Sequence, residues 1–213
     1  PRRCPALRSC GRNALLQGVI FDLDGTLVDS DLDFDQIRRD IGFVQGPILE
    51  FRDRHATQEQ KAHIDAVLER HEKRAAETCT LKDGAAALVE ALRGCGLKVA
   101  LLTRNSAASV GTVMARHGLK FDTIVSREDS APKPAPEPVF LICRRLGIEP
   151  SRTLMVGDYK YDVECGKNAG CLTVLVRTPL RSWFEAAPDW EVDSLAEVLP
   201  IVRGLAVKGE AVG

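Results

Sequence analysis

The sequence predicts an α/β protein in which a doubly wound, mostly parallel sheet carries a small all-α cap inserted after the first strand. From Gly18 onward, short apolar runs alternate with amphipathic helical stretches. Between Asp29 and about Leu81 this alternation stops, and only helical patterns remain. The 213 residues are 45% hydrophobic and 28% charged, which is typical of a globular chain large enough for one core domain with an insertion.

We therefore expect three parts. Residues 18–29 and 82–213 form the core domain, and residues 30–81 form the helical cap. Residues 1–17 contain four arginines and no acid, and we expect them to form a flexible N-terminal arm. An organelle transit segment is the alternative interpretation of the arm.

Continuous apolar runs predict the strands, because helices cover both faces of a parallel sheet. The predicted strands are residues 19–21, 97–102, 123–125, 153–156 and 172–176.

Capping residues and glycines predict the helices. Asp83 and Ser106 are expected N-caps, and Gly118 and Gly147 are expected C-terminal stops. The predicted core helices are residues 83–94, 106–118, 136–147, 162–169 and 194–202, and the predicted cap helices are residues 33–41, 46–54 and 57–78.

Charge and cysteine content exclude several classes of protein. The 29 basic and 30 acidic residues give a net charge of −1, so we expect neither a nucleic acid nor a membrane surface as partner. No obligate protein partner is indicated either. The seven cysteines are odd in number and form no C-x-x-C, which predicts reduced thiols and a cytoplasmic location.

Acidic side chains follow the first predicted strand. Asp22 and Asp24 are two residues apart, so an extended backbone would point both carboxylates the same way. Two carboxylates at a strand end are costly to bury without a cation, and Mg²⁺ is the usual partner of carboxylates and substrate phosphate.

Other polar residues follow the later strands. Thr103 to Ser106 place hydroxyls and helix-start amides where an anion could bind. Lys133 lies between prolines, and Asp158 and Asp162 follow the fourth predicted strand. Each could alone be an ordinary cap or turn residue. Because ligands of doubly wound sheets bind beyond the carboxyl ends of the strands, we expect these residues to share one site.

The same segments resemble the motifs of the haloacid dehalogenase superfamily of hydrolases. Residues 21–27, FDLDGTL, resemble its first motif, D-x-D-G-T-[LV], and residues 157–162, GDYKYD, its fourth, G-D-x-x-x-D. Thr103 to Asn105 are similar to the second motif and Lys133-Pro134 to the third. The cap resembles the C1-type cap of the phosphoglycolate phosphatase-like branch. Tyr159 stands where many relatives have Ser.

The resemblance implies two catalytic carboxylates. Asp22 would be the nucleophile that forms an aspartyl-phosphate, and Asp24 the general acid and then the general base. Mg²⁺ would be held by the carboxylates of Asp22 and Asp158 and by the backbone carbonyl of Asp24, with Asp162 supporting these ligands.

The resemblance also implies a phosphate-binding set. Thr103 and Lys133 would bind the phosphoryl oxygens, with Asn105 assisting. Arg104, bulkier than the residue often found there, belongs to this segment; we expect it to face solvent, with contact to a substrate anion as the alternative.

The predicted function is Mg²⁺-dependent hydrolysis of a small phosphorylated metabolite, such as phosphoglycolate or a sugar phosphate. A phosphomutase of the β-phosphoglucomutase type is the alternative. A 2-haloacid dehalogenase, which would generally lack Asp24, and a non-catalytic binding protein are less favoured.

Several cap and C-terminal residues have less specific interpretations. We expect the cap arginines to lie on solvated helix faces, although they could meet a second anionic group of the substrate; they are Arg38, Arg39, Arg52 and Arg54. His55, His63 and His71 are expected at the surface, and Trp183 and Trp190 are expected to be packing anchors.

Overall fold

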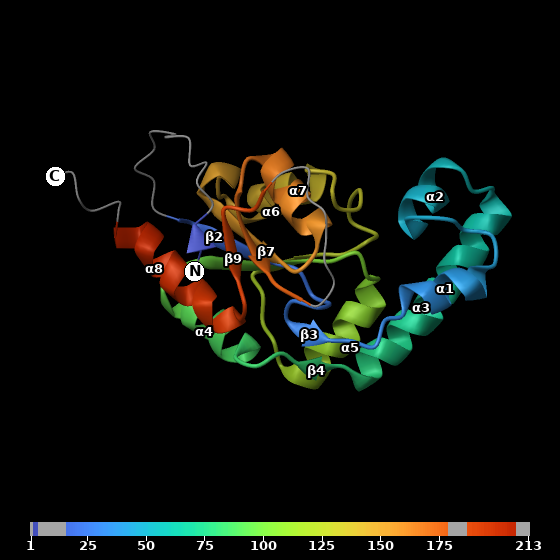
Figure 1. Cartoon of the computed structure of the whole chain (residues 1–213), viewed down its shortest axis with the longest axis horizontal. Coiled ribbons are helices and arrows are strands. Elements are labelled where there is room, and N and C mark those ends of the chain that lie inside the picture. The colour runs from blue at the N-terminus through green and yellow to red at the C-terminus, as the bar shows by residue number, and fades with distance from the viewer. Residues whose placement is uncertain (1, 4–15, 179–186, 208–213) are drawn as a thin grey trace.

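The computed structural model describes residues 2–3, 16–178 and 187–207, and it confirms the predicted fold class (Figure 1). The central sheet has the strand order β1-β9-β8-β7-β2-β5-β6. Its strands pair in parallel except β1, which runs antiparallel to β9. The strands are β1 (Arg2–Arg3), β2 (Gly18–Phe21), β5 (Lys98–Leu102), β6 (Thr123–Val125), β7 (Thr153–Gly157), β8 (Leu172–Val176) and β9 (Trp190–Val192).

Helices cover both faces of this sheet (Figure 1). Val19 and Phe21 of β2 face one apolar cluster, which α4, α5 and α8 complete, whereas Ile20 faces the cluster of α6 and α7. Both faces of the strand are therefore buried, which is why the strands appear in the sequence as continuous apolar runs. The helices are α4 (Ala85–Gly94), α5 (Ala107–His117), α6 (Glu137–Leu146), α7 (Lys160–Ala169) and α8 (Val198–Val207).

A helical insertion leaves the core between β3 (Val28–Asp29) and β4 (Thr80–Leu81), which pair antiparallel. This pairing brings the two ends of the insertion together. We call its helices the cap; they are α1 (Phe34–Ile41), α2 (Ile48–Arg54) and α3 (Gln58–Thr78). The cap extends away from the sheet and has an apolar cluster of its own (Figure 1). Its members are Ile37, Ile41, Val44, Ile48, Leu49, Ile64, Val67 and Leu68.

Most predicted helix ends are correct, and three are not. Ser106 is the N-cap of α5, and Gly118 and Gly147 end their helices with φ of +67° and +65°. Asp83 does not cap α4, because the chain turns there and Gly84 occupies the cap position with φ of +79°. The α7 helix begins at Lys160, two residues earlier than predicted. The last helix begins with a 3-10 turn, Leu195–Glu197, and runs on to Val207.

The remaining side-chain predictions have mixed outcomes. Trp190 packs against the larger core cluster, as predicted, whereas Trp183 lies outside the described residues. His55 and His63 are exposed, but His71 is half-buried and its Nε2 lies 2.7 Å from Oδ2 of Asp40. His71 is thus less exposed than the other two, because α1 packs on α3 and brings Asp40 beside it.

The predicted reduced cysteines agree with the structure within its described part, where the free thiols are Cys79, Cys95, Cys143, Cys165 and Cys171. Apart from β1, the predicted N-terminal arm lies largely outside the described residues.

Candidate active site

Three carboxylates meet at the carboxyl edge of the sheet. Asp22 follows β2, Asp158 follows β7, and Asp162 lies in the first turn of α7. One oxygen from each lies within 4.8 Å of the others. The strands β2 and β7 are parallel neighbours, and the backbone N–H of Asp22 donates to the carbonyl of Val156 at 2.9 Å. Parallel pairing thus places the two strand-end acids side by side, as the sequence predicts.

Lys133 joins this acidic group from the loop before α6. Its Nζ donates to Oδ1 of Asp22 at 2.5 Å, to Oδ1 of Asp162 at 2.6 Å and to the carbonyl of Leu102 at 3.2 Å. The side chain is only 3% exposed. Burial opposes its charge, but the attraction of Asp162 and Asp22 outweighs burial and raises the pKa of Lys133 above its ordinary value. All three ammonium donors are therefore bound to the protein, two of them to carboxylates.

The surroundings disfavour the negative charge of these acids. Burial raises the pKa of Asp22 well above its ordinary value; Asp162, Asp158 and Asp24 raise it further, and only Lys133 opposes them. Burial, followed by the charge of Asp162, raises the pKa of Asp158 to about 6. One lysine among four carboxylates leaves an excess of buried negative charge. A hard divalent cation with oxygen ligands fits this donor set, and Mg²⁺ is such a cation.

Asp24 is held apart from this group by its own hydrogen bonds. Its Oδ1 accepts from Oγ of Ser30 at 2.5 Å, and its Oδ2 accepts from Nδ2 of Asn105 at 2.6 Å. Burial raises its pKa despite both bonds. The Asp24 carboxylate thus has partners different from those of Asp22, and a raised pKa suits a group that must carry a proton.

Two glycines make room for the acids. Gly25 has φ of +78°, and a Cβ there would lie 2.3 Å from Oδ2 of Asp158. A Cβ on Gly157 would lie 2.2 Å from Cβ of Asp162. The next residue, Thr26, donates from Oγ1 to Oδ1 of Asp158 at 3.2 Å. Glycine is therefore required where the backbone after β2 and the end of β7 approach the carboxylates.

The segment after β5 brings two more predicted residues to this edge. Thr103 is buried, its N–H donates to the carbonyl of Val125 at 3.1 Å, and its Oγ1 accepts from the N–H of Asn105 at 3.1 Å. Asn105 in turn contacts Asp24. We call residues 103–106 the β5 loop.

Arg104 does not face solvent, so the preferred interpretation from the sequence was wrong. Its side chain is 22% exposed, and Nη2 donates to Oε2 of Glu50 in the cap at 2.8 Å. Nη1 donates to the carbonyl of Lys133 at 2.9 Å, and the guanidinium lies 4.8 Å from the ring centre of Tyr161. Arg104 was misjudged because its partners come from the cap and from distant core loops.

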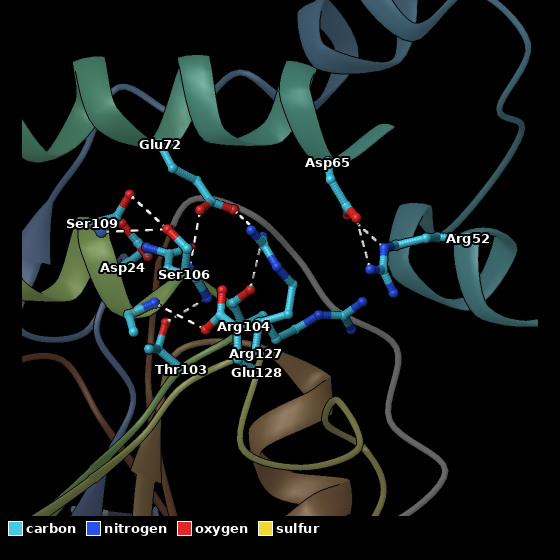
Figure 2. A network of polar contacts seen from close by, with 12 residues as sticks. Asp24, Arg52, Asp65, Glu72, Thr103, Arg104, Ser106, Ser109, Arg127 and Glu128 are labelled. Carbon is cyan, nitrogen blue, oxygen red and sulfur yellow. Dashed lines mark hydrogen bonds and ion pairs between the residues drawn. The ribbon is translucent and has the colours of Figure 1, made fainter. Parts of the chain in front are cut away.

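The helix-start amides predicted to bind an anion are already engaged. The N–H of Ser106 donates to Oε2 of Glu72 at 3.0 Å (Figure 2). The N–H of Ala107 donates to Oε2 of Glu128 at 3.0 Å. Two carboxylates of the chain itself thus occupy the backbone amides that were expected to bind an anion. Sequence reasoning missed Glu72, although it falls four residues after Leu68 on the buried stripe of α3, where an acid is unusual.

A cleft of about 310 Å³ lies between cap and core beside these amides. Arg52 lines it and forms an ion pair with Asp65 of α3, from Nε to Oδ1 at 2.5 Å. It is therefore not on a freely solvated face as expected. Arg38 pairs with Asp35 on the outer face of α1, and Arg39 bonds to Gln36. The lining residues are Arg52, Asp65, Glu69, Ser106, Ala108, Arg127 and Glu128.

Comparison with known proteins identifies the family. The sequence profile of the haloacid dehalogenase-like hydrolases matches residues 19–176, and the chain belongs to this family. It is 30% identical over 201 residues to an uncharacterized hydrolase of Saccharomyces cerevisiae, covering 89% of this chain and 92% of that protein. It is 31% identical over 185 residues to the N-acetylmuramic acid 6-phosphate phosphatase of Pseudomonas aeruginosa, covering 76% and 82%.

A solved structure, that of CbbY from Rhodobacter sphaeroides in complex with phosphate, shares the fold. The TM-score is 0.68 at 23% sequence identity, over 86% of this chain and 96% of that one. The predicted enzyme class, a phosphatase of this hydrolase family, is confirmed by the family match and the phosphatase relatives. In the described part of the chain, no helix combines the length and apolar character needed to cross a membrane.

Proposed function

We propose that this chain is a Mg²⁺-dependent phosphatase that hydrolyses a small phosphomonoester through a phosphorylated Asp22. The observation that supports it best is the division between the acids. Asp22 lies with Asp158, Asp162 and Lys133 in a group suited to a cation, while Asp24 has separate partners and a raised pKa. A nucleophile and a proton donor are thus two residues apart in different surroundings.

In the first step, an oxygen of Asp22 attacks phosphorus and the bond from phosphorus to the ester oxygen breaks. Lys133 fixes the orientation of the Asp22 carboxylate through Oδ1. Asp24 gives its proton to the departing alkoxide, so that an alcohol leaves. The carboxylates of Asp22 and Asp158 and the carbonyl of Asp24 would hold Mg²⁺, and the bound ion would supply positive charge that offsets the charge of the phosphoryl oxygens.

In the second step, Asp24 acts in the opposite direction. Its carboxylate takes a proton from a water molecule, whose oxygen attacks the phosphorus. The bond from phosphorus to the oxygen of Asp22 breaks, and inorganic phosphate is released. Asp22 and the proton on Asp24 are then restored, so the cycle balances. Ser30 and Asn105 hold Asp24 in place for both transfers. Thr103 and Asn105 would bind the phosphoryl oxygens, and Lys133 would join them by giving up its bond to the carbonyl of Leu102. The cap would limit the access of water.

The proposed substrate class rests on the small cap and on the charge of the chain. The cap consists of the three helices α1 to α3, and a cap of this size suits a small phosphomonoester, such as a phosphoglycolate-like compound or a sugar phosphate. The net charge of −1 gives no support for a nucleic acid or membrane partner.

The test is a screen of phosphorylated metabolites with Mg²⁺, followed by Asp22→Asn and Asp24→Asn. We expect Asp22→Asn to lose about 10³-fold or more in turnover, and Asp24→Asn to lose about 10²-fold or more. The exposed Asp31→Asn serves as the matched control. Turnover that survives Asp22→Asn would refute the mechanism. Reaction in ¹⁸O-labelled water distinguishes hydrolysis from a mutase, because only hydrolysis places the label in released phosphate.

A further inference from the structure

The start of α5 binds carboxylates that come from other parts of the chain (Figure 2). The first amides of a helix lack partners within the helix and carry partial positive charge, so they attract anions. Glu72 of the cap occupies the N–H of Ser106, and Glu128 of the core occupies the N–H of Ala107. The hydroxyl of Ser106 caps the N–H of Ser109 at 3.3 Å.

Glu72 is the buried member of this arrangement. It is 4% exposed, and its Oε1 forms a short ion pair with Nη1 of Arg127 while its Oε2 accepts from Ser106. Both carboxylate oxygens are therefore satisfied by core groups. A buried carboxylate is retained only with such partners, because removal from water is costly.

Arg127 holds the other side of the β5 loop. Its backbone N–H donates to the carbonyl of Asn105 at 2.9 Å, and its Nη1 also lies 3.5 Å from the carbonyl of Arg104. Together, Glu72 and Arg127 bind the backbone of three successive residues, Arg104 to Ser106. In Figure 2 the two side chains meet between helix α3 and this loop.

The β5 loop carries groups that the proposed mechanism uses. Asn105 reaches Oδ2 of Asp24, and Thr103 is buried at the end of β5. A shift of the loop backbone would therefore move the amide of Asn105 relative to Asp24. Small displacements of positioning groups have large effects on rate.

We propose that Glu72 is a positioning residue through which cap helix α3 sets the geometry of the β5 loop. Its carboxylate docks on Ser106 and Arg127, and the loop then presents Asn105 and Thr103 to the reacting group. The catalytic part of this inference rests on the proposed phosphatase function. Because Glu72 holds the amide of Ser106, the substrate phosphoryl group is left to the side chains of the loop and Lys133.

The docking of Glu72 on the β5 loop is tested without an activity measurement, by hydrogen exchange of the peptide that covers this loop. Glu72→Ala should speed exchange of these amides by about 10-fold or more, because the Ser106 amide loses its acceptor and Arg127 its partner. Glu72→Gln should have a smaller effect. Glu77→Gln, an exposed acid on the same helix, is the matched control and should match the wild type.

The catalytic part is tested with p-nitrophenyl phosphate and Mg²⁺ well below the unfolding temperature of each variant. We expect Glu72→Ala to lower kcat by about 10-fold and to weaken inhibition by inorganic phosphate, because the loop loses its position. Arg127→Lys should keep more activity than Arg127→Met. A residue that only stabilises the fold would lower the unfolding temperature and leave the kcat and phosphate inhibition of the folded protein unchanged.

The outcomes separate the two proposals. Exchange and kinetics of Glu72→Ala within two-fold of the wild type would overturn the positioning role. Glu72→Ala could speed exchange of the loop while the wild-type protein hydrolyses no phosphomonoester. That result would support the docking of Glu72 and overturn the phosphatase function. If Glu72→Ala does not fold, Glu72→Gln and the Arg127 pair provide the same comparison.

Discussion

The edge of the sheet and the cap use acidic residues in opposite ways. At the sheet edge, Asp22, Asp158 and Asp162 crowd around Lys133, and their charge exceeds what one lysine can offset. In the cap, Glu50 and Glu72 each meet one arginine of the core. The first arrangement carries more acidic than basic groups, whereas the second is balanced within the chain. We infer that the excess of buried acidic groups indicates the candidate site of chemistry. The balanced ion pairs of Glu50 and Glu72 indicate the contacts by which the cap orients that site.

The largest expected effect is on the unbalanced group. Asp158→Asn should reduce turnover by about 10²-fold or more, because a proposed ligand of the cation is lost. Without metal, the same change should raise the unfolding temperature, because a buried carboxylate crowded by Asp162 is removed. Calorimetry with Mg²⁺ and thermal unfolding with and without Mg²⁺ measure both effects. Stabilisation by Mg²⁺ equal to that of the wild type would show that Asp158 is not a ligand.

The next effect separates a glycine at the sheet edge from one in the cap. Gly25→Ala should cost about 2–4 kcal/mol of unfolding free energy, because it adds a clash with Asp158 to an unfavourable positive φ. Gly42→Ala shares the positive φ, +88°, but its Cβ would meet nothing within 4 Å. It should cost only about 1 kcal/mol. Equal costs in chemical denaturation would contradict the tight approach at Gly25.

The pH dependence of Mg²⁺ binding tests the crowding of the acids at the sheet edge. Because the pKa of Asp158 is raised from 3.8 to about 6, the metal must displace a proton below that pH. Affinity should fall by about 10-fold per pH unit below 6, and more steeply if Asp22 also takes up a proton. Without metal, the folding stability changes with pH in the opposite direction. The contribution of Asp158 to stability is fully present below pH 3.8 and is lost as the pH rises through about 6. Titrations from pH 5 to 8 test this, and a flat affinity would contradict it.

The smallest expected effect is on a paired contact of the cap. Glu50→Gln removes the charge that faces Arg104, and both side chains are about a quarter exposed, which limits the interaction to about 1 kcal/mol. We expect KM for p-nitrophenyl phosphate to rise about two- to five-fold with little change in kcat. Asp31→Asn is again the control. A large loss of kcat at constant KM would instead place Arg104 in the chemical step.

The residues at the strand ends were predictable because their placement depends on local pattern and strand pairing alone. Asp22, Lys133 and Asp158 follow or flank recognisable elements, and parallel strands bring their carboxyl ends to one edge. The separate partners of Asp24 were not predictable. Ser30 lies six residues away but reaches Asp24 only because the chain turns back after Gly25.

The sequence by itself determined the fold class, the existence of a helical insertion and the acids of the candidate site, because hydrophobic periodicity and motif spacing are properties of short segments. Only the tertiary structure decided that Arg104 contacts Glu50 and that Glu72 occupies the start of α5. These contacts join residues 54 and 34 positions apart. The contact of Glu72 depends on how α3 packs against α5, and that of Glu50 depends also on how α2 packs against α3. The partner of an isolated charged residue cannot be predicted from the sequence around it, because the packing of the cap on the core determines which residues meet.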